Sequence, residues 1–164
     1  MTDLLIKLYA LPAQPTPPAK IDIRRAFAAE RRLVCDWVAE RFTQGWTSEC
    51  DASFSRLPVA CFLAQNGEQI LGFACYDAAA RGLFGPTGVD QSRRKEGIGA
   101  ALLLATLYDM AAQGYAYAVI GWPDSPEFYR KHIGAIEIPD SDPGFYHGLI
   151  NRKSKIDPSK ANRE

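Results

Sequence analysis

Residues 89–103 read VDQSRRKEGIGAALL, and this stretch decides how the rest of the chain is interpreted. It leaves an apolar run, passes through a short basic turn and enters a strongly apolar stretch after a Gly-Ile-Gly sequence. The start of a helix exposes backbone N–H groups, which a Ser, Thr, Asp or Asn side chain usually caps. Here the preceding positions hold Arg94, Lys95 and Glu96, which are poor caps. The stretch therefore predicts a helix over residues 98–113 whose N-terminus is open to an anion.

Two glycines, Gly97 and Gly99, open this predicted helix. Each costs the helix about 1 kcal/mol relative to alanine, but a glycine also lets a phosphate approach the backbone. The helix dipole favours negative charge at this end by about 0.3–2 kcal/mol, and the three adjacent basic residues add positive potential. Neither standard phosphate loop fits, since no Gly-Lys-Ser/Thr follows and Leu102 occupies the third glycine position of GxGxxG. Two interpretations stay open: a phosphate site of another type, or a plain turn with a basic surface cluster.

The run before the turn, residues 83–89, reads as a strand that cannot pair along its whole length. Pro86 has no N–H to donate to a sheet, and Gly85 and Gly88 are typical of bulges or of close backbone approach. This strand is therefore predicted to splay from a neighbour. A splayed strand that leads to an anion-binding helix suits an elongated ligand. Such a ligand would carry phosphates at one end and an extended chain that pairs with the free backbone groups of residues 85–89.

The rest of the chain predicts a mixed α/β domain. Asn66-Gly67 is a strong hairpin signal between two apolar runs, and Ser125-Pro126-Glu127 is typical of a helix start. The other elements follow from hydrophobic periodicity and from breaks at Pro and Gly. The first part of the chain is predicted to form a strand over 4–10, a proline-rich connector over 12–18, a helix over 24–42 and a loop, which could include one short helix, over 44–58. Hairpin strands over 59–65 and 69–76 and a strand over 83–89 then lead to the helix over 98–113. A strand over 115–122, a short helix to residue 132 and two final strands over 135–138 and 145–150, which could pair, complete the prediction.

Two motifs resemble those of the GNAT N-acetyltransferase superfamily. Arg94-x-x-Gly97-x-Gly99 is similar to its (Q/R)-x-x-G-x-(G/A) acetyl-CoA motif, and residues 127–135, EFYRKHIGA, are similar to its FYxKxGF segment. The resemblance covers residues 4–150 and implies the family's fold. That fold is a mixed α+β domain with a central, mostly antiparallel sheet, splayed between the fourth and fifth strands and flanked by helices. We accordingly expect one acetyltransferase-like domain over residues 1–150 and a polar tail over 151–164.

The resemblance also implies where acetyl-CoA would bind. Backbone amides of residues 94–100 would hold the pyrophosphate, and the backbone of Gly88 and Val89 would pair with the pantetheine arm. An amide near Thr87 and Gly88 would polarise the acetyl carbonyl and stabilise the oxyanion. Tyr129 matches the family tyrosine that serves as general acid, or as hydrogen-bond donor, toward the leaving CoA thiolate; a core tyrosine is the alternative. The expected cofactor-binding set is Thr87, Gly88, Val89, Arg94, Lys95, Glu96, Gly97, Ile98, Gly99 and Ala100, and no metal is expected.

Two departures from the family pattern leave alternatives open. Trp122 stands where the family often has an Asn that contacts pantetheine, and no carboxylate falls between residues 83 and 89, where some members place a Glu. The remaining candidates for the general base are Asp77, Asp124, Glu127 or a water chain. The leading interpretation is transfer of an acetyl group from acetyl-CoA to a primary amine of a small acceptor, by direct attack in a ternary complex. The alternative is a non-catalytic acyl-CoA-binding or regulatory module.

Composition argues against several other classes of protein. The 164 residues carry 19 basic and 19 acidic side chains, and a chain without net positive charge is a poor general binder of nucleic acid. No apolar run approaches the roughly 18 residues of a membrane span, and the charged opening segment is not typical of a signal peptide. We therefore expect a soluble cytoplasmic protein that binds a small-molecule amine and neither nucleic acid nor membrane. A homodimer contact through the final strands and the tail stays open.

The four cysteines, Cys35, Cys50, Cys61 and Cys75, form no CxxC pair, and no histidine stands at zinc-binding spacing from them. The chain's two histidines are too few for a His-rich metal site. Reduced core thiols are therefore the prediction, with a reactive or metal-binding role as the alternative.

Overall fold

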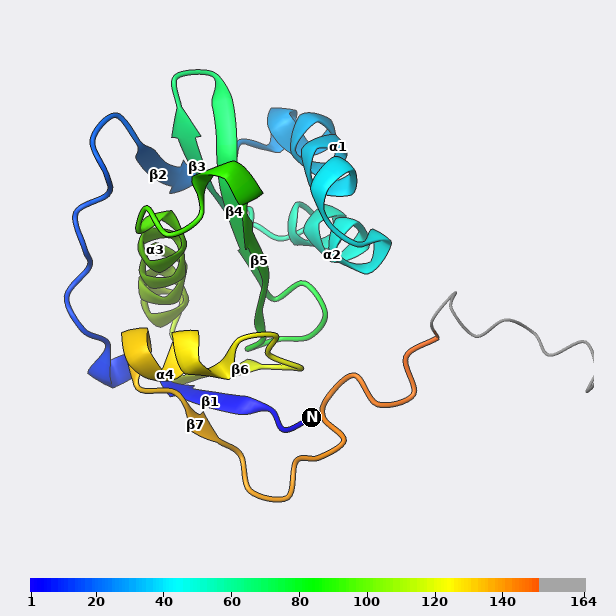
Figure 1. Cartoon of the computed structure of the whole chain (residues 1–164). Helices are drawn as coiled ribbons and strands as arrows, with labels where there is room; N and C mark the ends of the chain where they lie inside the picture. Colours follow the sequence, from blue (N-terminus) through cyan, green and yellow to red (C-terminus); the bar gives the residue numbers. More distant parts are fainter. Residues whose placement is uncertain (151–164) are drawn as a thin grey trace, which may run out of the picture.

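The computed structural model describes residues 1–150, and the predicted tail over 151–164 lies outside the described residues. Strands, α-helices and short 3₁₀ helices alternate along these residues (Figure 1). In chain order they are β1 (Leu4–Lys7), the 3₁₀ helix η1 (Leu8–Ala10), β2 (Asp22–Arg25), η2 (Ala28–Glu30), α1 (Arg31–Arg41), α2 (Gln44–Ser53), β3 (Cys61–Asn66), β4 (Gln69–Tyr76), β5 (Phe84–Val89), η3 (Gln91–Arg93), α3 (Ile98–Ala112), β6 (Tyr117–Ile120), α4 (Pro126–Ile133) and β7 (Ile136–Glu137).

The strands form two sheets, and all neighbours within each sheet are antiparallel. The larger sheet has the order β2-β3-β4-β5, and the smaller one has the order β6-β1-β7. Helix α3 packs on one face of the larger sheet, while α1 and α2 cover the other face (Figure 1). Side chains of β4 alternate between the two faces, with Ala74 and Tyr76 under α3 and Phe73 and Cys75 under α1 and α2. Because both faces are covered, β4 is apolar along nearly its whole length.

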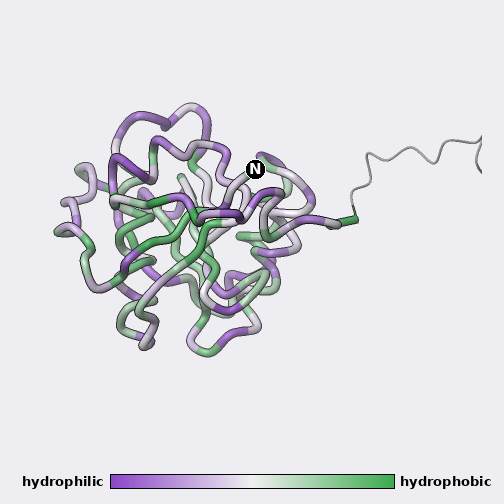
Figure 2. Tube along the Cα trace, turned by 90° about the horizontal axis from the view of Figure 1, so that it is seen from below, coloured by the Kyte–Doolittle hydropathy of each residue, from purple (hydrophilic) through white to green (hydrophobic). Residues whose placement is uncertain are grey.

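The first residues of the chain complete the smaller sheet. Strand β1 lies between β6 and β7, with Leu4 opposite Ile120 and Ile6 opposite Ala118. All four side chains are buried in the core that also contains α3. Figure 2 shows hydrophobic segments running through the middle of the molecule, with hydrophilic segments mainly outside. Within residues 1–150, none of the helices combines the length and the apolar character needed to cross a membrane.

Within residues 1–150, backbone pairing between the two sheets is confined to the start of β5. Leu83 forms an isolated bridge with Val119, whose N–H donates to the Gly82 carbonyl at 2.9 Å. Beyond this bridge, no backbone hydrogen bond within residues 1–150 joins β5 to β6. Gly85 has a φ of +126° and Pro86 lacks an N–H, and the pairing of β5 with β4 shifts register beside them. The structure confirms the predicted mixed α/β fold, in which a mostly antiparallel sheet splays between the strands at 84–89 and 117–120.

Residues 24–42 are not the single helix that their periodicity predicts. Asp22–Arg25 forms β2, paired with β3, and α1 begins only at Arg31. The side chain of Arg25 explains the difference, because its guanidinium donates to the Val59 carbonyl and to the Asp109 carboxylate, each at 2.5 Å. Both partners are distant in the sequence, so the local pattern could not reveal them.

The ends of the chain also depart from prediction. The first strand ends at Lys7 and continues as η1 instead of reaching residue 10. The two final segments do not pair, because β7 pairs with β1 and residues 145–150 contain no strand. Phe145 donates its N–H to the Asp3 carboxylate at 2.8 Å, and Gly144 and Gly148 both have positive φ. These contacts hold the segment as a series of turns along the N-terminal residues.

The segment over 44–58 contains a longer helix than the sequence indicates. Helix α2 has ten residues and is capped by Thr43, whose hydroxyl accepts the Trp46 N–H at 3.3 Å. Its residues include Gly45 and several small polar side chains, so its apolar period is weak. The signal that could have located this helix is the Thr cap rather than the periodicity.

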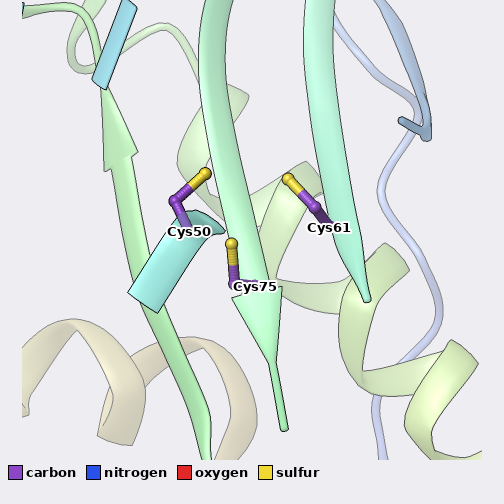
Figure 3. Close-up of side chains that lie close together, drawn as sticks. All are labelled: Cys50, Cys61 and Cys75. Atoms are coloured by element: carbon purple, nitrogen blue, oxygen red, sulfur yellow. The ribbon is translucent and has the colours of Figure 1, made fainter. Parts of the chain in front are cut away.

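Three of the four cysteines lie together in the core between α2 and the larger sheet (Figure 3). The sulfur atoms of Cys50, Cys61 and Cys75 are all within 4.8 Å of one another. The neighbouring Cys50 thiol and burial raise the pKa of Cys61, and burial raises the pKa of Cys75. Thiols that stay protonated in an apolar core are inert toward electrophiles, which agrees with the predicted packing role.

Candidate functional site

The N-terminus of α3 is open. Gly97 occupies the N-cap position in the left-handed region (φ +86°), and no side chain caps the helix. The first backbone bond of the helix runs from the Ala101 N–H to the Gly97 carbonyl at 3.1 Å. Within residues 1–150, the N–H groups of Ile98, Gly99 and Ala100 have no hydrogen-bond partner. Three convergent free donors at the positive end of a helix form a site for an anion.

The residues before α3 differ in how their charges are compensated. Arg93 pairs with Glu96, with 2.8 Å between Nη2 and Oε2. Arg94 touches only the Val89 carbonyl, at 3.5 Å, and neither Arg94 nor Lys95 forms an ion pair with any described residue. Of the three basic side chains in the predicted cluster, two therefore keep their charge available to a ligand.

Asp90 fixes the turn that connects β5 to α3. Its carboxylate accepts the Ser92 N–H at 3.0 Å and the Arg41 Nε at 2.8 Å. Hydrogen bonds from the Ser92 hydroxyl and from the Arg41 guanidinium lower the pKa of Asp90 to about 2. The charged carboxylate thus ties the turn to α1 at neutral pH.

Strand β5 leads from the point of divergence to this open helix end. Thr87, Gly88 and Val89 pair with β4 on one side, while their other edge faces the gap toward β6. The ring of Phe42 covers Gly88, and a Cβ there would lie 2.5 Å from Cζ of the ring. The structure therefore brings the predicted residues of β5 and of the α3 N-terminus together along one continuous path of backbone.

Tyr129 stands beside β5 at the other end of this path. Its ring makes an edge contact with Phe84, with 6.4 Å between ring centroids, and another with Phe128 at 5.3 Å. Burial raises the pKa of Tyr129 to about 12, and the nearby Asp124 carboxylate adds to the rise. No described residue forms a hydrogen bond with its hydroxyl. Tyr129 is thus a protonated donor without an internal partner.

The three carboxylates expected as base candidates differ in availability. Asp77 accepts the Gly82 N–H at 2.7 Å and the Tyr115 hydroxyl at 2.6 Å, which fixes it in a turn. Glu127 pairs with Arg130 on α4. Asp124 is exposed, forms no hydrogen bond with the described chain and acts on Tyr129 through its charge. Asp124 is therefore the one of the three that is not held by other groups.

Trp122 belongs to a cluster that holds the segment after β7. Its indole Nε1–H donates to the Pro143 carbonyl at 2.6 Å, its backbone N–H donates to Asp3 at 3.4 Å, and its ring packs on Tyr146 with 5.6 Å between centroids. The φ of +46° at Trp122 turns the chain sharply at the end of β6. The side chain is oriented by these contacts toward the C-terminal segment.

One acidic residue of the site was not expected from the sequence. Glu49 on α2 is half-buried and accepts the hydroxyl hydrogen of Tyr146 at 2.7 Å. Burial raises the pKa of Glu49, and the Tyr146 hydrogen bond offsets part of the rise. Its partner lies 97 residues along the chain, and no local motif marks either residue.

Residues 31–135 match the model of the acetyltransferase (GNAT) family. The chain belongs to the GNAT acetyltransferase family. This membership confirms the resemblance seen in the sequence, and it assigns the chain to a family of acyltransferases that typically use acetyl-CoA.

Solved GNAT structures share the fold. A GCN5-related N-acetyltransferase from Sphaerobacter thermophilus has a TM-score of 0.64 at 22% identity, covering 84% of this chain and 48% of that chain. The glucosamine N-acetyltransferase region of a fungal multi-domain GH3 β-N-acetylglucosaminidase has a TM-score of 0.65 at 14% identity, covering 84% and 19%. An aminoglycoside acetyltransferase from an uncultured soil metagenomic sample has a TM-score of 0.51 at 15% identity, covering 70% and 88%. At these identities the likeness establishes the fold alone.

This chain spans about half the length of the Sphaerobacter protein. No curated protein matches it.

Proposed function

We propose that this GNAT domain transfers an acetyl group from acetyl-CoA to a primary amine of a small acceptor, by direct attack in a ternary complex. One observation carries the proposal. The free N–H groups of Ile98, Gly99 and Ala100, the unpaired edge of β5 and the unpartnered Tyr129 hydroxyl lie along a single path between the two sheets. Acetyl-CoA consists, in this order, of an anionic pyrophosphate, an extended chain with amide groups and a thioester. The free N–H groups suit the pyrophosphate, the edge of β5 suits the amide chain, and the Tyr129 hydroxyl suits the thioester sulfur.

The residues present fit acetyl-CoA. The amides at the start of α3, with Arg94 and Lys95, suit the pyrophosphate. The backbone of Gly88 and Val89 suits the amides of the pantetheine arm, and an N–H near Thr87 suits the acetyl carbonyl oxygen. When bound, acetyl-CoA supplies an acetyl group activated as a thioester.

Tyr129 would act at the leaving group. The phenol is protonated at neutral pH, and burial raises its pKa further, to about 12. A neutral donor beside β5 can give its proton to the departing sulfur, or hold that sulfur by a hydrogen bond. The buried thiols Cys50, Cys61 and Cys75 are protonated and enclosed, which supports direct attack by the acceptor over a cysteine acyl-enzyme.

A small amine is favoured as acceptor for two reasons. The chain has no net charge, so it offers no strong field for a polycationic protein tail. Two proteins of the same fold are named for small amino-sugar acceptors, glucosamine and an aminoglycoside.

A non-catalytic acyl-CoA-binding module is the second candidate, because β5 carries no carboxylate and Trp122 replaces the family Asn.

The test combines binding with turnover. Calorimetry should show that acetyl-CoA and CoA bind, and release of the CoA thiol should rise when an amine panel containing glucosamine, kanamycin and 2-phenylethylamine is added. Tyr129→Phe should lower kcat by about 100-fold or more while the affinity for CoA stays within about threefold. Tyr117→Phe on β6 is the matched control, because it removes an exposed hydroxyl that is hydrogen-bonded to the hydroxyl of Tyr9. It should leave both kcat and the affinity for CoA unchanged. Binding without turnover of any amine would favour the module, and absence of CoA binding would overturn the proposal.

A further inference from the structure

Glu49 and Tyr146 join the two halves of the split sheet. Glu49 lies on α2, which packs against β4 and β5 of the larger sheet on the side opposite α3 (Figure 1). Tyr146 lies in the segment after β7, and its ring covers Gly121 at the end of β6 so closely that a Cβ there would be 2.8 Å from Cε2. Their 2.7 Å hydrogen bond therefore spans the gap between β5 and β6 on the face that α3 leaves open.

Aromatic rings lie next to both residues of this hydrogen bond. Trp46, one helical turn before Glu49, stacks on Phe42 with 5.2 Å between centroids, and Phe42 covers Gly88 of β5. On the other side, Tyr146 packs on Trp122 with 5.6 Å between centroids. The hydrogen bond thus links the side that carries Trp46 and Phe42, next to β5, with the side that carries Tyr146 and Trp122, next to the end of β6.

Glu49 also lacks a compensating charge. Asp109, which is similarly sheltered, pairs with Arg25 at 2.5 Å, whereas Glu49 has no cationic partner within residues 1–150. Within these residues, its one hydrogen bond comes from the Tyr146 hydroxyl. The other carboxylate oxygen of Glu49 therefore has no partner among residues 1–150. The Asp3 carboxylate, which acts on Tyr146 through its charge, accepts the N–H groups of Trp122 and Phe145. A partly desolvated, unpaired carboxylate among aromatic rings is a receptor for an organic cation.

We propose that Glu49 and Tyr146 form the acceptor-binding site, in which the Glu49 carboxylate holds the ammonium group of a small arylalkyl primary amine and then takes its proton. This inference rests on the proposed acetyltransferase function and names its acceptor class. In this site the aryl group of the acceptor packs against Trp46 and against the ring of Trp122, which is 38% exposed, and the Tyr146 hydroxyl donates to the carboxylate. The raised pKa of Glu49 suits it to receiving a proton.

The proton balance of the step follows from these assignments. Glu49 takes one proton from the ammonium group, so the nitrogen lone pair is free to form the N–C bond. When the C–S bond breaks, Tyr129 gives its hydroxyl proton to the sulfur. The second proton of the nitrogen restores the Tyr129 hydroxyl, and Glu49 releases the first proton to solvent. The products are one amide, one thiol and one proton.

The test measures binding of a charged probe and its neutral analogue. Tryptophan fluorescence, from Trp46 one helical turn before Glu49 and from Trp122 packed on Tyr146, reports titrations of 2-phenylethylamine and 2-phenylethanol into the CoA-loaded protein. Wild type should bind the amine at least tenfold more tightly than the alcohol. Glu49→Gln keeps an acceptor for the Tyr146 hydroxyl and should bind both probes equally, while its affinity for CoA stays unchanged. Glu68→Gln removes a carboxylate from the exposed β3–β4 turn and should keep the wild-type preference.

Two further readouts make the result decisive. Tyr146→Phe, which keeps the ring over Gly121, should weaken amine binding about threefold and leave CoA binding intact. An undiminished amine preference in Glu49→Gln, or no saturable amine binding by wild type, overturns the assignment of Glu49. If wild type binds CoA in either case, only this inference fails. If wild type binds neither CoA nor acetyl-CoA, the acetyltransferase proposal itself fails.

Discussion

The ring of Phe42 lies directly over Gly88, and a Cβ at Gly88 would be only 2.5 Å from Cζ of that ring. Phe42 ends α1, and Gly88 lies on the strand whose free edge faces the gap between the sheets. This contact lets the α1–α2 layer lie flat against β5. A side chain at residue 88 would push that layer away from the strand.

Gly88→Ala is therefore expected to lower the free energy of unfolding by about 1–3 kcal/mol. Urea denaturation measures the change. In a Phe42→Ala background the same substitution should cost almost nothing, so the double-mutant cycle isolates the ring contact. Gly45→Ala is the control, because a Cβ at Gly45 meets only Thr43 Oγ1 at 3.9 Å. Equal costs in both backgrounds would show that the Phe42 ring is not the obstacle.

The uneven pairing of the basic residues before α3 leads to a second prediction. Arg94→Gln and Lys95→Gln should each weaken CoA binding about three- to tenfold, equivalent to ~0.7–1.4 kcal/mol, because neither side chain has a carboxylate partner among residues 1–150. Arg93→Gln should have a smaller effect, since Glu96 already compensates Arg93. Calorimetry over a range of salt concentrations measures the affinity for CoA and the extent to which salt weakens it by screening the charges.

Arg32→Gln, on the exposed surface of α1, supplies the control for net charge. It should leave CoA binding unchanged. If all four substitutions weaken binding equally, the effect comes from the overall field of the protein and not from the start of α3.

These residues also show how far the sequence could lead. Gly97 and Gly99, without a capping side chain before them, were enough to predict an open helix end, and Pro86 predicted the splayed strand, because both signals are local properties of the backbone. The Glu49–Tyr146 bond could not be predicted, since it depends on how α2 and the C-terminal segment meet across the fold. The helix predicted over 24–42 failed for the same reason, because distant partners of Arg25 hold its first residues in a strand.

The hydrogen bonds of Asp90 lead to a prediction about pH. The pKa of Asp90 falls from its ordinary 3.8 to about 2 in the folded protein. A carboxyl whose pKa is lower in the folded state contributes stability above its unfolded pKa, and this contribution disappears as the pH falls through the folded value. Asp90→Asn should therefore be less stable than wild type above about pH 4. The difference should shrink between pH 4 and pH 2.

Urea denaturation at pH 7, 5, 3 and 2 tests this dependence. Asp36→Asn removes a carboxylate whose pair with Arg32 is highly exposed, and it should change stability little at any of these values. A difference between Asp90→Asn and wild type that stays constant down to pH 2 would mean that the Ser92 and Arg41 contacts do not depend on the charge of Asp90.

The cysteine group leads to the last prediction, which concerns access. Cys50, Cys61 and Cys75 are fully buried with their sulfur atoms within 4.8 Å of one another, whereas Cys35 is partly exposed. Iodoacetamide should therefore modify Cys35 alone in the folded protein, and slowly, because burial and the Asp51 carboxylate raise the pKa of that thiol. The other three should react only at the rate at which the protein unfolds. Mass spectrometry of peptides after timed labelling gives each rate, and Cys35→Ser should remove the native-state reaction entirely. Modification of Cys50 or Cys75 at the rate of Cys35 would show that α2 detaches from the sheet without global unfolding.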